Sequence, residues 1–596
     1  MTFEIAIVLI ILILAIILFA SEKLPIDLVA ILIMATLILT GIISPEQGVS
    51  GFSNTATITV AAMFILAAGL FKTGAVSNLG VMLSKLFLKN FWFALLVMMI
   101  TVGVISAFIN NTPVVAIFIP LVITAAKKSG ISSSKFLIPL SFASIFGGVC
   151  TLIGTSTNIL VSGIAVQYGE QPFSMFQMAP MGIIFFIIGL IYMVFVGVKL
   201  IPDRQADEDL TDKFGLGEYL TEIVILEGAP SIGKPIYLSP LMKDLDIEVL
   251  ELERNKGKHT FPSPVFILQE GDILKIKCNV DELKKIQKRE HIALKTDIKF
   301  GDKELRSDEL TLLEAILPPN SELVGSTLKK SDFRNRYGAT ALAIRNRGEI
   351  VRENLGNLEL KSGDTLLLEV QKERLLGFKD FVVTRGRPFL ILSEEDVPTY
   401  NPKKVFFAVS IIAGVVISAT LGMNIMVSAI VGCLLLILSS CISVTQAYQS
   451  IEWKVIFLLA GALSLGVAMQ ESGTAKFLAD GIVSHVGDLG PIFVLSAIYL
   501  LTSLLTEAMS NNASAVLIAP IAIAISYEFG VSPVPFLMAV AFAASASFMT
   551  PVGYQTNTMV YGAGNYKFFD FMKVGVPLAL IYWIVATIML PILFPF

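Results

Sequence analysis

Cysteine, histidine, tryptophan and charged residues are scarce in this sequence. Its 596 residues include 4 cysteines, 3 histidines and 3 tryptophans, and neither the cysteines nor the histidines show metal-ligand spacing, so neither a disulfide framework nor a zinc site is indicated. Charged residues make up 15% of the chain, and the formal net charge is -4. Because no basic stripe stands out, we expect no nucleic-acid partner. No nucleophile, base and orienting residue are grouped, so we do not expect an enzyme.

Apolar residues are abundant instead, at 55% of the chain. Runs of about 17 to 22 apolar residues, long enough to cross roughly 30 Å of hydrocarbon, recur through residues 1–202 and 403–596, with a charged segment between them. The first run lacks the basic start and the cleavage site of a signal peptide, so we interpret it as a retained helix. We predict a polytopic α-helical membrane protein with a soluble α+β insert.

Each membrane part is predicted to contain five spans, one interfacial helix and one hairpin, in the same order. In the first part the spans lie near 2–20, 24–42, 54–73, 136–165 and 174–200, the interfacial helix near 76–89 and the hairpin near 91–127. In the second part the spans lie near 404–421, 423–444, 454–470, 534–562 and 572–595, the interfacial helix near 473–486 and the hairpin near 490–526.

Two polar motifs inside apolar runs occur in both parts. "AFINNTPVVAIFIP" (107–120) matches "EAMSNNASAVLIAP" (507–520), and "TLIGTSTNILV" (151–161) matches "TPVGYQTNTMV" (550–560). Two such matches in the same order indicate an internal repeat.

Lysines give the orientation of the repeats, because short cytoplasmic loops are enriched in Lys and Arg. One face carries Lys23, Lys72, Lys85, Lys89, Lys127, Lys128, Lys135, Lys454, Lys567 and Lys573. The opposite loops contain almost only Lys476. With the insert cytoplasmic, the first hairpin enters from the cytoplasm and the second from outside. Inverted repeats of this kind are typical of secondary transporters with a site near the midplane, so we expect a multi-pass protein of the cell (inner or plasma) membrane.

The polar tips require a buried or water-lined place, because non-helical backbone is otherwise not tolerated at membrane depth. Asn111 or Thr112 is predicted to cap the returning helix, with Pro113 in its first turn. Gly154 and Gly553 are predicted to break two long spans. Helix N-termini favour an anion, whereas freed carbonyls and side-chain oxygens suit sodium.

Two questions stay open at this point. Polar residues inside membranes also hold helices together without binding a ligand. Glu507 stands just before the second tip, and it is either linked to an ion or bonded to amides of the hairpin.

The motifs resemble those of the divalent anion/sodium symporter family, within the ion transporter superfamily, whose tips read Ser-Asn-Thr and whose broken helices read Gly-Thr-Pro-Pro-Asn. The resemblance covers both membrane parts and implies two sodium sites with an anion between the tips. The implied sodium ligands are Asn111, Gly154, Thr155, Asn158, Thr506, Asn511, Thr550, Gly553 and Asn557. The implied anion-binding residues are Asn110, Asn111, Thr112, Ser156, Thr157, Ser510, Asn511, Asn512 and Thr556.

Three departures from the family pattern concern the substrate. Ser156 and Thr157 replace the Pro-Pro of dicarboxylate carriers, and Asn110 replaces the first Ser. The chain is more similar to a sulfate-transporting branch with a soluble insert, so sulfate and co-transported sodium are expected. A di- or tricarboxylate/sodium symporter, a proton-coupled antiporter, a gated channel and an anion sensor remain alternatives.

The insert itself contains a second repeat. Residues 218–291 match residues 307–384, with the turn Gly271-Asp272 corresponding to Gly363-Asp364. Both segments resemble TrkA C-terminal (RCK-type) domains. That resemblance implies a homodimer and a small regulatory ligand on the modules.

Overall fold

The computed structural model describes residues 2–21, 24–75, 90–203, 220–242, 247–254, 257–260, 262–277, 292–294, 310–319, 321–346, 349–352, 354–371, 388–392 and 402–596. The chain divides into a helical unit, Met1–Gln205 with Glu394–Phe596, and a sheet unit, Ala206–Ser393. The predicted interfacial helix at 76–89 lies outside the described residues.

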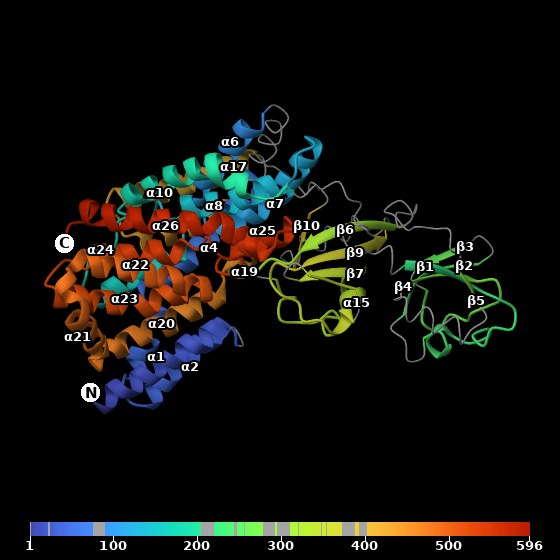
Figure 1. The fold of residues 1–596 in the computed structure, drawn as a ribbon, viewed down its shortest axis with the longest axis horizontal. Coiled ribbons are helices and arrows are strands. Elements are labelled where there is room, and N and C mark those ends of the chain that lie inside the picture. Colours follow the sequence, from blue (N-terminus) through green and yellow to red (C-terminus); the bar gives the residue numbers. More distant parts are fainter. Residues whose placement is uncertain are drawn as a thin grey trace. The chain divides into compact units, whose positions relative to one another are not determined.

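The helical unit contains two series of helices in a similar order (Figure 1). The first half, residues 2–203, contains α1 (Phe3–Ser21), α2 (Ile26–Leu39), α3 (Pro45–Ser53), α4 (Thr55–Lys72), α6 (Phe91–Ser106), α7 (Asn111–Lys128), α8 (Ser134–Gly148), α9 (Ser156–Gln167), α10 (Ala179–Tyr192), a π-helical turn (Met193–Gly197) and α11 (Val198–Leu200). The second half, residues 402–596, contains α17 (Pro402–Thr420), α18 (Ile425–Leu438), α19 (Val444–Ser450), α20 (Trp453–Glu471), α21 (Thr474–Val486), α22 (Pro491–Ala508), α23 (Asn511–Glu528), α24 (Val534–Ser545), α25 (Gln555–Ala563) and α26 (Phe568–Leu593).

The short helices α3 and α19 were not predicted. Each begins with a capping box, in which a serine side chain accepts from the third helical N–H and a glutamine side chain accepts from the serine N–H. The pairs are Ser44 with Gln47 and Ser443 with Gln446. The pattern Ser-x-x-Gln is present at both places in the sequence. Because each copy follows an apolar run that was assigned to a span, it did not by itself indicate a further helix.

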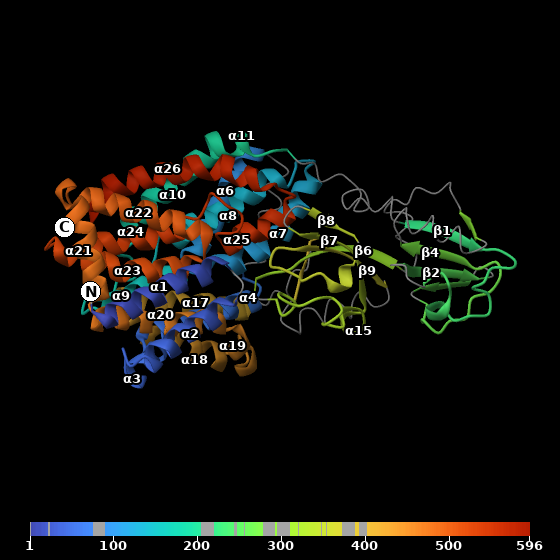
Figure 2. The same cartoon turned by 60° about the horizontal axis from the view of Figure 1, so that its bottom comes forward.

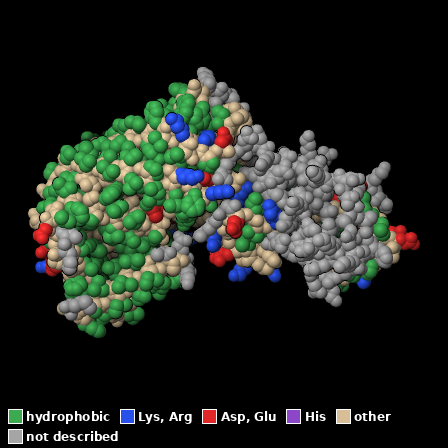
Figure 3. Space-filling view, in the orientation of Figure 1, with side chains coloured by type: hydrophobic (Ala, Val, Ile, Leu, Met, Phe, Trp, Pro, Cys, Tyr) green, Lys and Arg blue, Asp and Glu red, His purple; other side chains and the backbone are tan. Residues whose placement is uncertain are grey.

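The outer surface of the helical unit is apolar. Along α26 the exposed side chains include Leu580, Ile584, Ile588 and Ile592, four residues apart and therefore on one face of the helix. The space-filling view shows hydrophobic side chains over most of the visible surface of this unit (Figure 3). Such a surface is stable in lipid and not in water.

Ten spans were predicted, and six stretches in the described part of the chain are long and apolar enough to cross a membrane. They are Pro45–Lys72, Ala179–Leu200, Pro402–Thr420, Trp453–Glu471, Pro491–Ala508 and Phe568–Leu593. Five of the six correspond to predicted spans, whereas Pro491–Ala508 was predicted as part of the second hairpin and not as a span. The other expected spans are shorter or interrupted helices in the described residues. α2, for example, has 14 residues, fewer than the roughly 20 that a perpendicular span requires.

Close helix packing links the two halves. α10 and α26 lie side by side in both ribbon views (Figures 1 and 2). The rings of Phe185 and Tyr582 stack with their centroids 4.1 Å apart, and the Tyr582 hydroxyl donates to Phe185 O at 2.6 Å. The Tyr192 hydroxyl donates to Val574 O at 2.7 Å. Aromatic stacking and satisfied hydroxyls therefore join the last helices of the two halves.

The sheet unit contains two five-stranded antiparallel sheets. The first contains β1 (Leu220–Ile225), β2 (Glu248–Arg254), β3 (Gly257–Thr260), β4 (Ile273–Lys277) and β5 (Ile292–Leu294), in the order β3-β2-β4-β1-β5. The second contains β6 (Leu310–Ile316), β7 (Ala339–Asn346), β8 (Glu349–Val351), β9 (Thr365–Gln371) and β10 (Leu390–Ile391), in the order β10-β6-β9-β7-β8, together with the short helix α15 (Phe333–Tyr337).

The two sheets have the same topology when read from opposite edges. A β-bulge lies between Val249 and Glu251 in β2 and at the matching place, between Ala341 and Ala343, in β7. The fifth strand of each sheet lies beyond the predicted module, because β5 begins at 292 and β10 at 390. The duplication is therefore structural as well as sequential, while the identity of the modules as RCK-type domains stays a prediction.

Corresponding turns of the two sheets are fastened differently. Asp272 Oδ2 accepts from Gln269 N at 2.8 Å, and Asp364 Oδ2 accepts from Lys361 N at the same distance. In the first sheet Arg254 also donates to both Asp272 oxygens at 2.7 Å, which raises the pKa of Arg254 above its ordinary value. The turn occurs in both sheets, and the repeat position of Arg254 is Asn346, whose Nδ2 lies 3.5 Å from Asp364 Oδ2.

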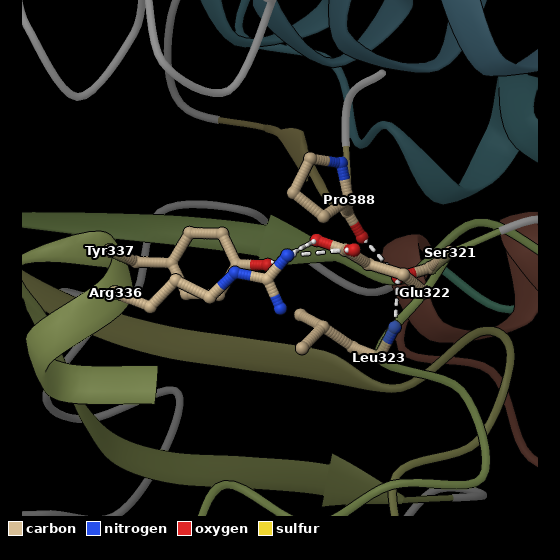
Figure 4. Close-up of polar contacts among 6 residues, drawn as sticks. All are labelled: Ser321, Glu322, Leu323, Arg336, Tyr337 and Pro388. Carbon is tan, nitrogen blue, oxygen red and sulfur yellow. Dashed lines mark hydrogen bonds and ion pairs between the residues drawn. The ribbon is translucent and has the colours of Figure 1, made fainter. Parts of the chain in front are cut away.

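Polar contacts near α15 hold the last strand of the second sheet (Figure 4). Arg336 donates to both carboxylate oxygens of Glu322 at 2.9 Å, and the Tyr337 hydroxyl donates to Glu322 Oε1 at 2.7 Å. The Ser321 hydroxyl donates to Pro388 O, two residues before β10 begins. α15 and the start of β10 are thus both attached to the 321–322 turn.

Candidate functional site

The first tip, residues 107–112, is a turn between α6 and α7. Asn110 Oδ1 accepts from Thr112 N at 3.3 Å and so caps α7. The predicted cap, Asn111 or Thr112, is wrong because both residues are already helical, whereas a cap requires non-helical dihedrals, and Asn110 has φ -51° and ψ 138°. Pro113 lies in the first turn, as predicted.

The second tip, residues 507–512, joins α22 to α23. Ser510 Oγ accepts from Ala513 N at 3.3 Å and caps α23. Asn511 is the first residue of α23, and its Oδ1 accepts from Thr506 Oγ1 at 2.8 Å. Thr506 Oγ1 also lies 2.7 Å from Ala544 O. The second tip is therefore tied to α22 and α24 of its own half.

Two unwound segments interrupt long spans. The first break, residues 149–155, separates α8 from α9, and the second break, residues 546–554, separates α24 from α25. Asn158 Nδ2 donates to Thr151 O at 2.8 Å and lies 3.5 Å from Gly148 O. Asn557 Nδ2 makes the equivalent bonds to Ser547 O at 2.9 Å and Thr550 O at 3.3 Å. In each half the asparagine amide thus replaces helix hydrogen bonds lost at the break.

The glycines of the breaks are required by close approach. A Cβ on Gly154 would lie 2.4 Å from Gly148 O, and a Cβ on Gly553 would lie 2.2 Å from Ser547 Oγ. Both glycines donate their N–H to a threonine hydroxyl, Gly154 to Thr151 at 3.2 Å and Gly553 to Thr550 at 3.1 Å. Each break is therefore a compact turn with no space for a larger residue.

Each break is also bonded to the tip of its own half. The Thr151 hydroxyl donates to Ala107 O. Glu507 Oε2 accepts from the Thr550 hydroxyl at 2.7 Å and from Thr550 N at 2.9 Å, and Glu507 Oε1 accepts from Met549 N at 2.9 Å. Glu507 thus bonds amides of the second break and not those of the hairpin, which favours the structural interpretation of this carboxylate.

The first tip contacts the second break across the two halves. Asn111 Nδ2 donates to the Tyr554 hydroxyl at 2.7 Å. Thr112 Oγ1 donates to Gln555 Oε1 at 2.8 Å.

The second tip contacts the start of α9 in the same way. Ser156 Oγ and Thr157 Oγ1 lie 3.1 Å and 3.2 Å from Asn512 Oδ1. Both tips and both breaks therefore meet in one region, and the predicted residues from distant parts of the chain converge.

The N-termini that meet there differ in capping. α7 and α23 are capped by their own tips, but no described side chain caps α9, preceded by Thr155, or α25, preceded by Tyr554. The first N–H groups of an uncapped helix have no intrahelical acceptor, and they favour a negatively charged ligand. Of the four helix N-termini at the tips and breaks, those of α9 and α25 therefore have N–H groups that a described side chain does not cap.

Several buried oxygens have no hydrogen-bond partner among the described residues. In the first half they include Ser106 Oγ, Asn111 Oδ1 and Asn158 Oδ1. In the second half they include Ser545 Oγ and Ser547 Oγ. Unpartnered buried oxygens are costly, so each such group is a candidate ligand for a cation.

The Thr556 side chain contacts α8. Its hydroxyl oxygen lies 2.8 Å from Ser141 Oγ of α8, and the same Ser141 Oγ lies 2.7 Å from Asn557 Oδ1. Asn557 Oδ1 accepts only, so the Ser141 hydrogen points to it and Thr556 donates to Ser141. The matching Thr157 faces Asn512 instead.

Sequence reasoning missed five residues of this region. They are Ser106, Ser141, Ser547, Tyr554 and Gln555. Tyr554 and Gln555 stand at the repeat positions of Thr155 and Ser156, so the match between halves was a usable signal. Ser141 corresponds to Val540, and no pattern in the sequence points to it.

The region contains no basic side chain. Residues 107–113, 149–158, 507–513 and 546–557 include no Lys or Arg. An anion bound there would be held by N–H groups, hydroxyls and any cation bound beside it.

Comparison with known proteins gives consistent matches along the chain. A sequence model described as citrate transporter matches residues 16–532 and 515–596. An uncharacterized transporter of Synechocystis sp. is 40% identical over 99% of this chain and 97% of its own length, and one of Escherichia coli is 33% identical over 98% of each. Sodium/sulfate cotransporter 2 of Chlamydomonas reinhardtii is 23% identical over 92% of this chain and 85% of its own length.

Proposed function

The chain belongs to the citrate transporter family, and from this membership we propose that it is a sodium-coupled symporter of a divalent anion, with sulfate as its substrate. The matched family is named for citrate and not for the divalent anion/sodium symporters that the motifs resemble. The protein is therefore a transporter rather than an enzyme, and the choice of anion and driving ion is the part proposed.

Sodium coupling is supported by the unpartnered oxygens of the first half. Asn111 and Asn158 have relative exposures of 1% and 0%, Ser106 is fully buried as well, and each has an oxygen without a partner in the described chain. Hydroxyl and amide oxygens suit a hard cation. We propose that sodium binds between the first tip and the first break, and a second sodium between the second tip and the second break.

The anion is proposed to lie between the tips. The uncapped starts of α9 and α25 supply N–H groups, and Thr112, Ser156 and Thr157 supply hydroxyls that bond across the halves. When the anion binds, each hydroxyl would donate to an anion oxygen in place of the protein oxygen that now accepts its hydrogen bond. A tetrahedral dianion accepts donors from several directions, which fits this arrangement.

Sulfate is favoured by two observations together. The hydroxyls of Ser156 and Thr157 stand where dicarboxylate carriers have Pro-Pro, and a related protein is named as a sodium/sulfate cotransporter. Burial of an uncompensated charge costs many kcal/mol, and without Lys or Arg the compensation falls to sodium. Transport is therefore proposed to depend steeply on sodium.

Citrate or another di- or tricarboxylate is the second candidate, because the family model carries that description. A proton-coupled antiporter is less well supported, since Glu507 is already engaged by three donors.

The membrane arrangement is part of the same proposal. We infer that the two halves are inverted repeats, that the hairpins are re-entrant and that transport proceeds by alternating access. The sheet unit is proposed to lie in the cytoplasm, to regulate transport through a small ligand and to support a homodimer.

Flux into proteoliposomes tests the proposal. Purified full-length protein should accumulate labelled sulfate under an inward sodium gradient and not under an equal choline gradient. Thiosulfate and selenate should compete, whereas citrate and succinate should compete poorly. Sodium-driven uptake of labelled citrate that excess sulfate does not block would replace sulfate by the carboxylate candidate, and equal uptake in choline would reject sodium coupling.

A further inference from the structure

Tyr554 contacts the first tip from the opposite half of the protein. It is the last residue before α25, and its hydroxyl accepts a hydrogen bond from Asn111 Nδ2 at 2.7 Å. Both side chains are buried, with relative exposures of 8% and 1%. The two residues are 443 positions apart in the chain.

The contact determines which end of the Asn111 amide faces the first break. A carboxamide has one oxygen that accepts and one nitrogen that donates. With Nδ2 directed to Tyr554, Oδ1 is the amide atom nearer to Gly148: a Cβ on that residue would lie 2.6 Å from Oδ1 and 2.9 Å from Nδ2. Oδ1 has no partner among the residues described. The reverse orientation would present N–H hydrogens on that side, which would repel a cation.

Two further unpartnered oxygens belong to Asn158, which bonds the first break, and to Ser106, whose neighbour Ala107 bonds it. Asn158 donates its Nδ2 to Thr151 O near Gly148, which leaves its Oδ1 without a partner in the described structure. Ser106 directly precedes Ala107, whose carbonyl accepts from Thr151. From these contacts we infer that the oriented Asn111 oxygen joins the unpartnered oxygens of Asn158 and Ser106 in one sodium site.

We propose that Tyr554 is a positioning residue for the first sodium position, holding the Asn111 amide with its oxygen toward the cation. This inference rests on the proposed function, because it requires sodium to bind at that position. In this proposal Tyr554 is not itself a sodium ligand and acts through Asn111.

The arrangement is not repeated in the second half. The repeat position of Tyr554 is Thr155, and Asn511 Oδ1 accepts from Thr506 within its own half. The first tip is thus oriented from the opposite half and the second tip from its own. If Tyr554 served only to pack the breaks, the two tips would not need to be oriented from different halves.

The position of Tyr554 also connects the cation to the anion. Gln555, the next residue, accepts from Thr112 of the same tip, and Thr112 is proposed to face the anion. An anion that draws Thr112 away from Gln555 changes the segment that orients Asn111. Sodium and sulfate affinities should therefore be linked, each raising the other by the same factor, and the linkage should weaken without the Tyr554 hydroxyl.

The test compares Tyr554→Phe with Tyr192→Phe in purified full-length protein. Tyr192 is the matched control, because it is a buried tyrosine whose hydroxyl donates to Val574 O, on α26. The thermal unfolding midpoint is measured against sodium chloride concentration without sulfate, with choline chloride keeping the ionic strength constant. The sodium dependence of the rate of sulfate uptake is measured in parallel.

Tyr554→Phe should raise the half-saturating sodium concentration about tenfold, as expected for the loss of about one hydrogen bond. The maximal uptake rate at saturating sodium should change little. Tyr192→Phe should lower the unfolding midpoint and leave the sodium dependence at the wild-type value. An unchanged sodium dependence in Tyr554→Phe overturns the proposal, and the absence of any sodium effect in the wild type overturns the proposed function with it.

A second variant removes the need for orientation. Asn111→Asp replaces the amide by a carboxylate with two equivalent oxygens and no N–H group. In this background the Tyr554 hydroxyl can only donate to the carboxylate, so Tyr554→Phe frees a carboxylate oxygen and should not raise the half-saturating sodium concentration by more than about twofold. A tenfold loss in both backgrounds would show that Tyr554 acts by some route other than the Asn111 amide, and would overturn the proposal.

Discussion

The first tip and break form one pair and the second tip and break another, and both pairs use the same framework. In each, an amide nitrogen of Asn158 or Asn557 bonds carbonyls of the break. In each, a threonine hydroxyl accepts from the glycine N–H.

The two pairs differ in which oxygens remain unpaired. In the first pair Ser106, Asn111 and Asn158 each present an oxygen without a partner in the described residues. At the matching positions of the second pair, Asn511 Oδ1 lies 2.8 Å from the Thr506 hydroxyl, which is also 2.7 Å from Ala544 O, and Ser141 donates to Asn557. The second pair also has the carboxylate of Glu507 where the first has Ala107.

This difference separates two tasks that the repeat performs. Breaking a helix at membrane depth requires the same backbone hydrogen bonds in both halves, so those side chains are alike. Binding a ligand requires free oxygens, and here the halves have diverged. At the matching positions the first pair presents oxygens without a partner in the described chain, whereas Asn511 and Asn557 of the second pair must exchange internal bonds; the unpartnered oxygens of the second half lie at other positions, on Ser545 and Ser547.

Removal of the Glu507 carboxylate should have the largest effect on stability. Glu507→Ala leaves two buried N–H groups and a hydroxyl without their acceptor, at a cost of about 2 to 5 kcal/mol in the free energy of unfolding. Thr151→Val in the first pair removes one hydroxyl, which donates to Ala107 O and accepts from Gly154 N, and should cost about 1 to 2 kcal/mol in the free energy of unfolding. Denaturant unfolding of both variants measures the difference, and equal losses would mean that the two pairs are held alike.

Ser106→Ala should affect sodium and leave the empty protein unchanged. Because Ser106 Oγ has no partner in the described chain, its removal breaks no hydrogen bond, and stability without sodium should stay within about 0.5 kcal/mol of the wild type. The half-saturating sodium concentration should rise about tenfold, or about 1.4 kcal/mol. The measurement is the unfolding midpoint of the variant at increasing sodium concentration. A titration curve identical to that of the wild type would show that Ser106 is not a sodium ligand of the first pair.

Ser141→Ala should have the opposite pattern of effects: it should lower stability without sodium and raise sodium affinity. Without sodium the free energy of unfolding of this variant should be about 1 kcal/mol lower than that of the wild type, because the hydrogen bonds of Ser141 with Asn557 and Thr556 disappear. With Asn557 Oδ1 freed, the sodium affinity of the second pair should rise. Ser144→Ala is the matched control, since its buried hydroxyl donates to Ser141 O within the same helix. A fall in sodium affinity would identify Ser141 as a ligand and remove the contrast between the pairs.

The capping boxes of α3 and α19 should show the smallest effect and no difference between the halves. Ser44→Ala and Ser443→Ala should each cost about 0.5 to 1 kcal/mol, since both serines make the same cap. Thermal unfolding of the two variants gives the comparison. Losses of stability that differ severalfold between the two variants would show that the halves differ in the hydrogen bonds that support their helices as well as in their ligand oxygens.

The sequence was sufficient to locate the tips and breaks and most of the residues that meet there. Asparagine, glycine and proline within an apolar run are local signals, and the match between halves strengthened them. The cap of α7 was assigned to the wrong neighbour, Asn111 or Thr112 instead of Asn110, because side-chain capping depends on dihedrals that a motif does not specify to one residue. Membrane orientation, the two sodium positions and the RCK-type modules stay predictions.

The sequence by itself determined that this chain is a helical transporter with duplicated polar interruptions, because apolar run length and breaking residues act over a few turns of helix. Only the tertiary structure decided which oxygens remain free. The bond from Asn111 to Tyr554 spans 443 positions and that from Ser141 to Asn557 spans 416. Both depend on how the two halves pack, and packing over such separations leaves no periodic trace in the order of residues.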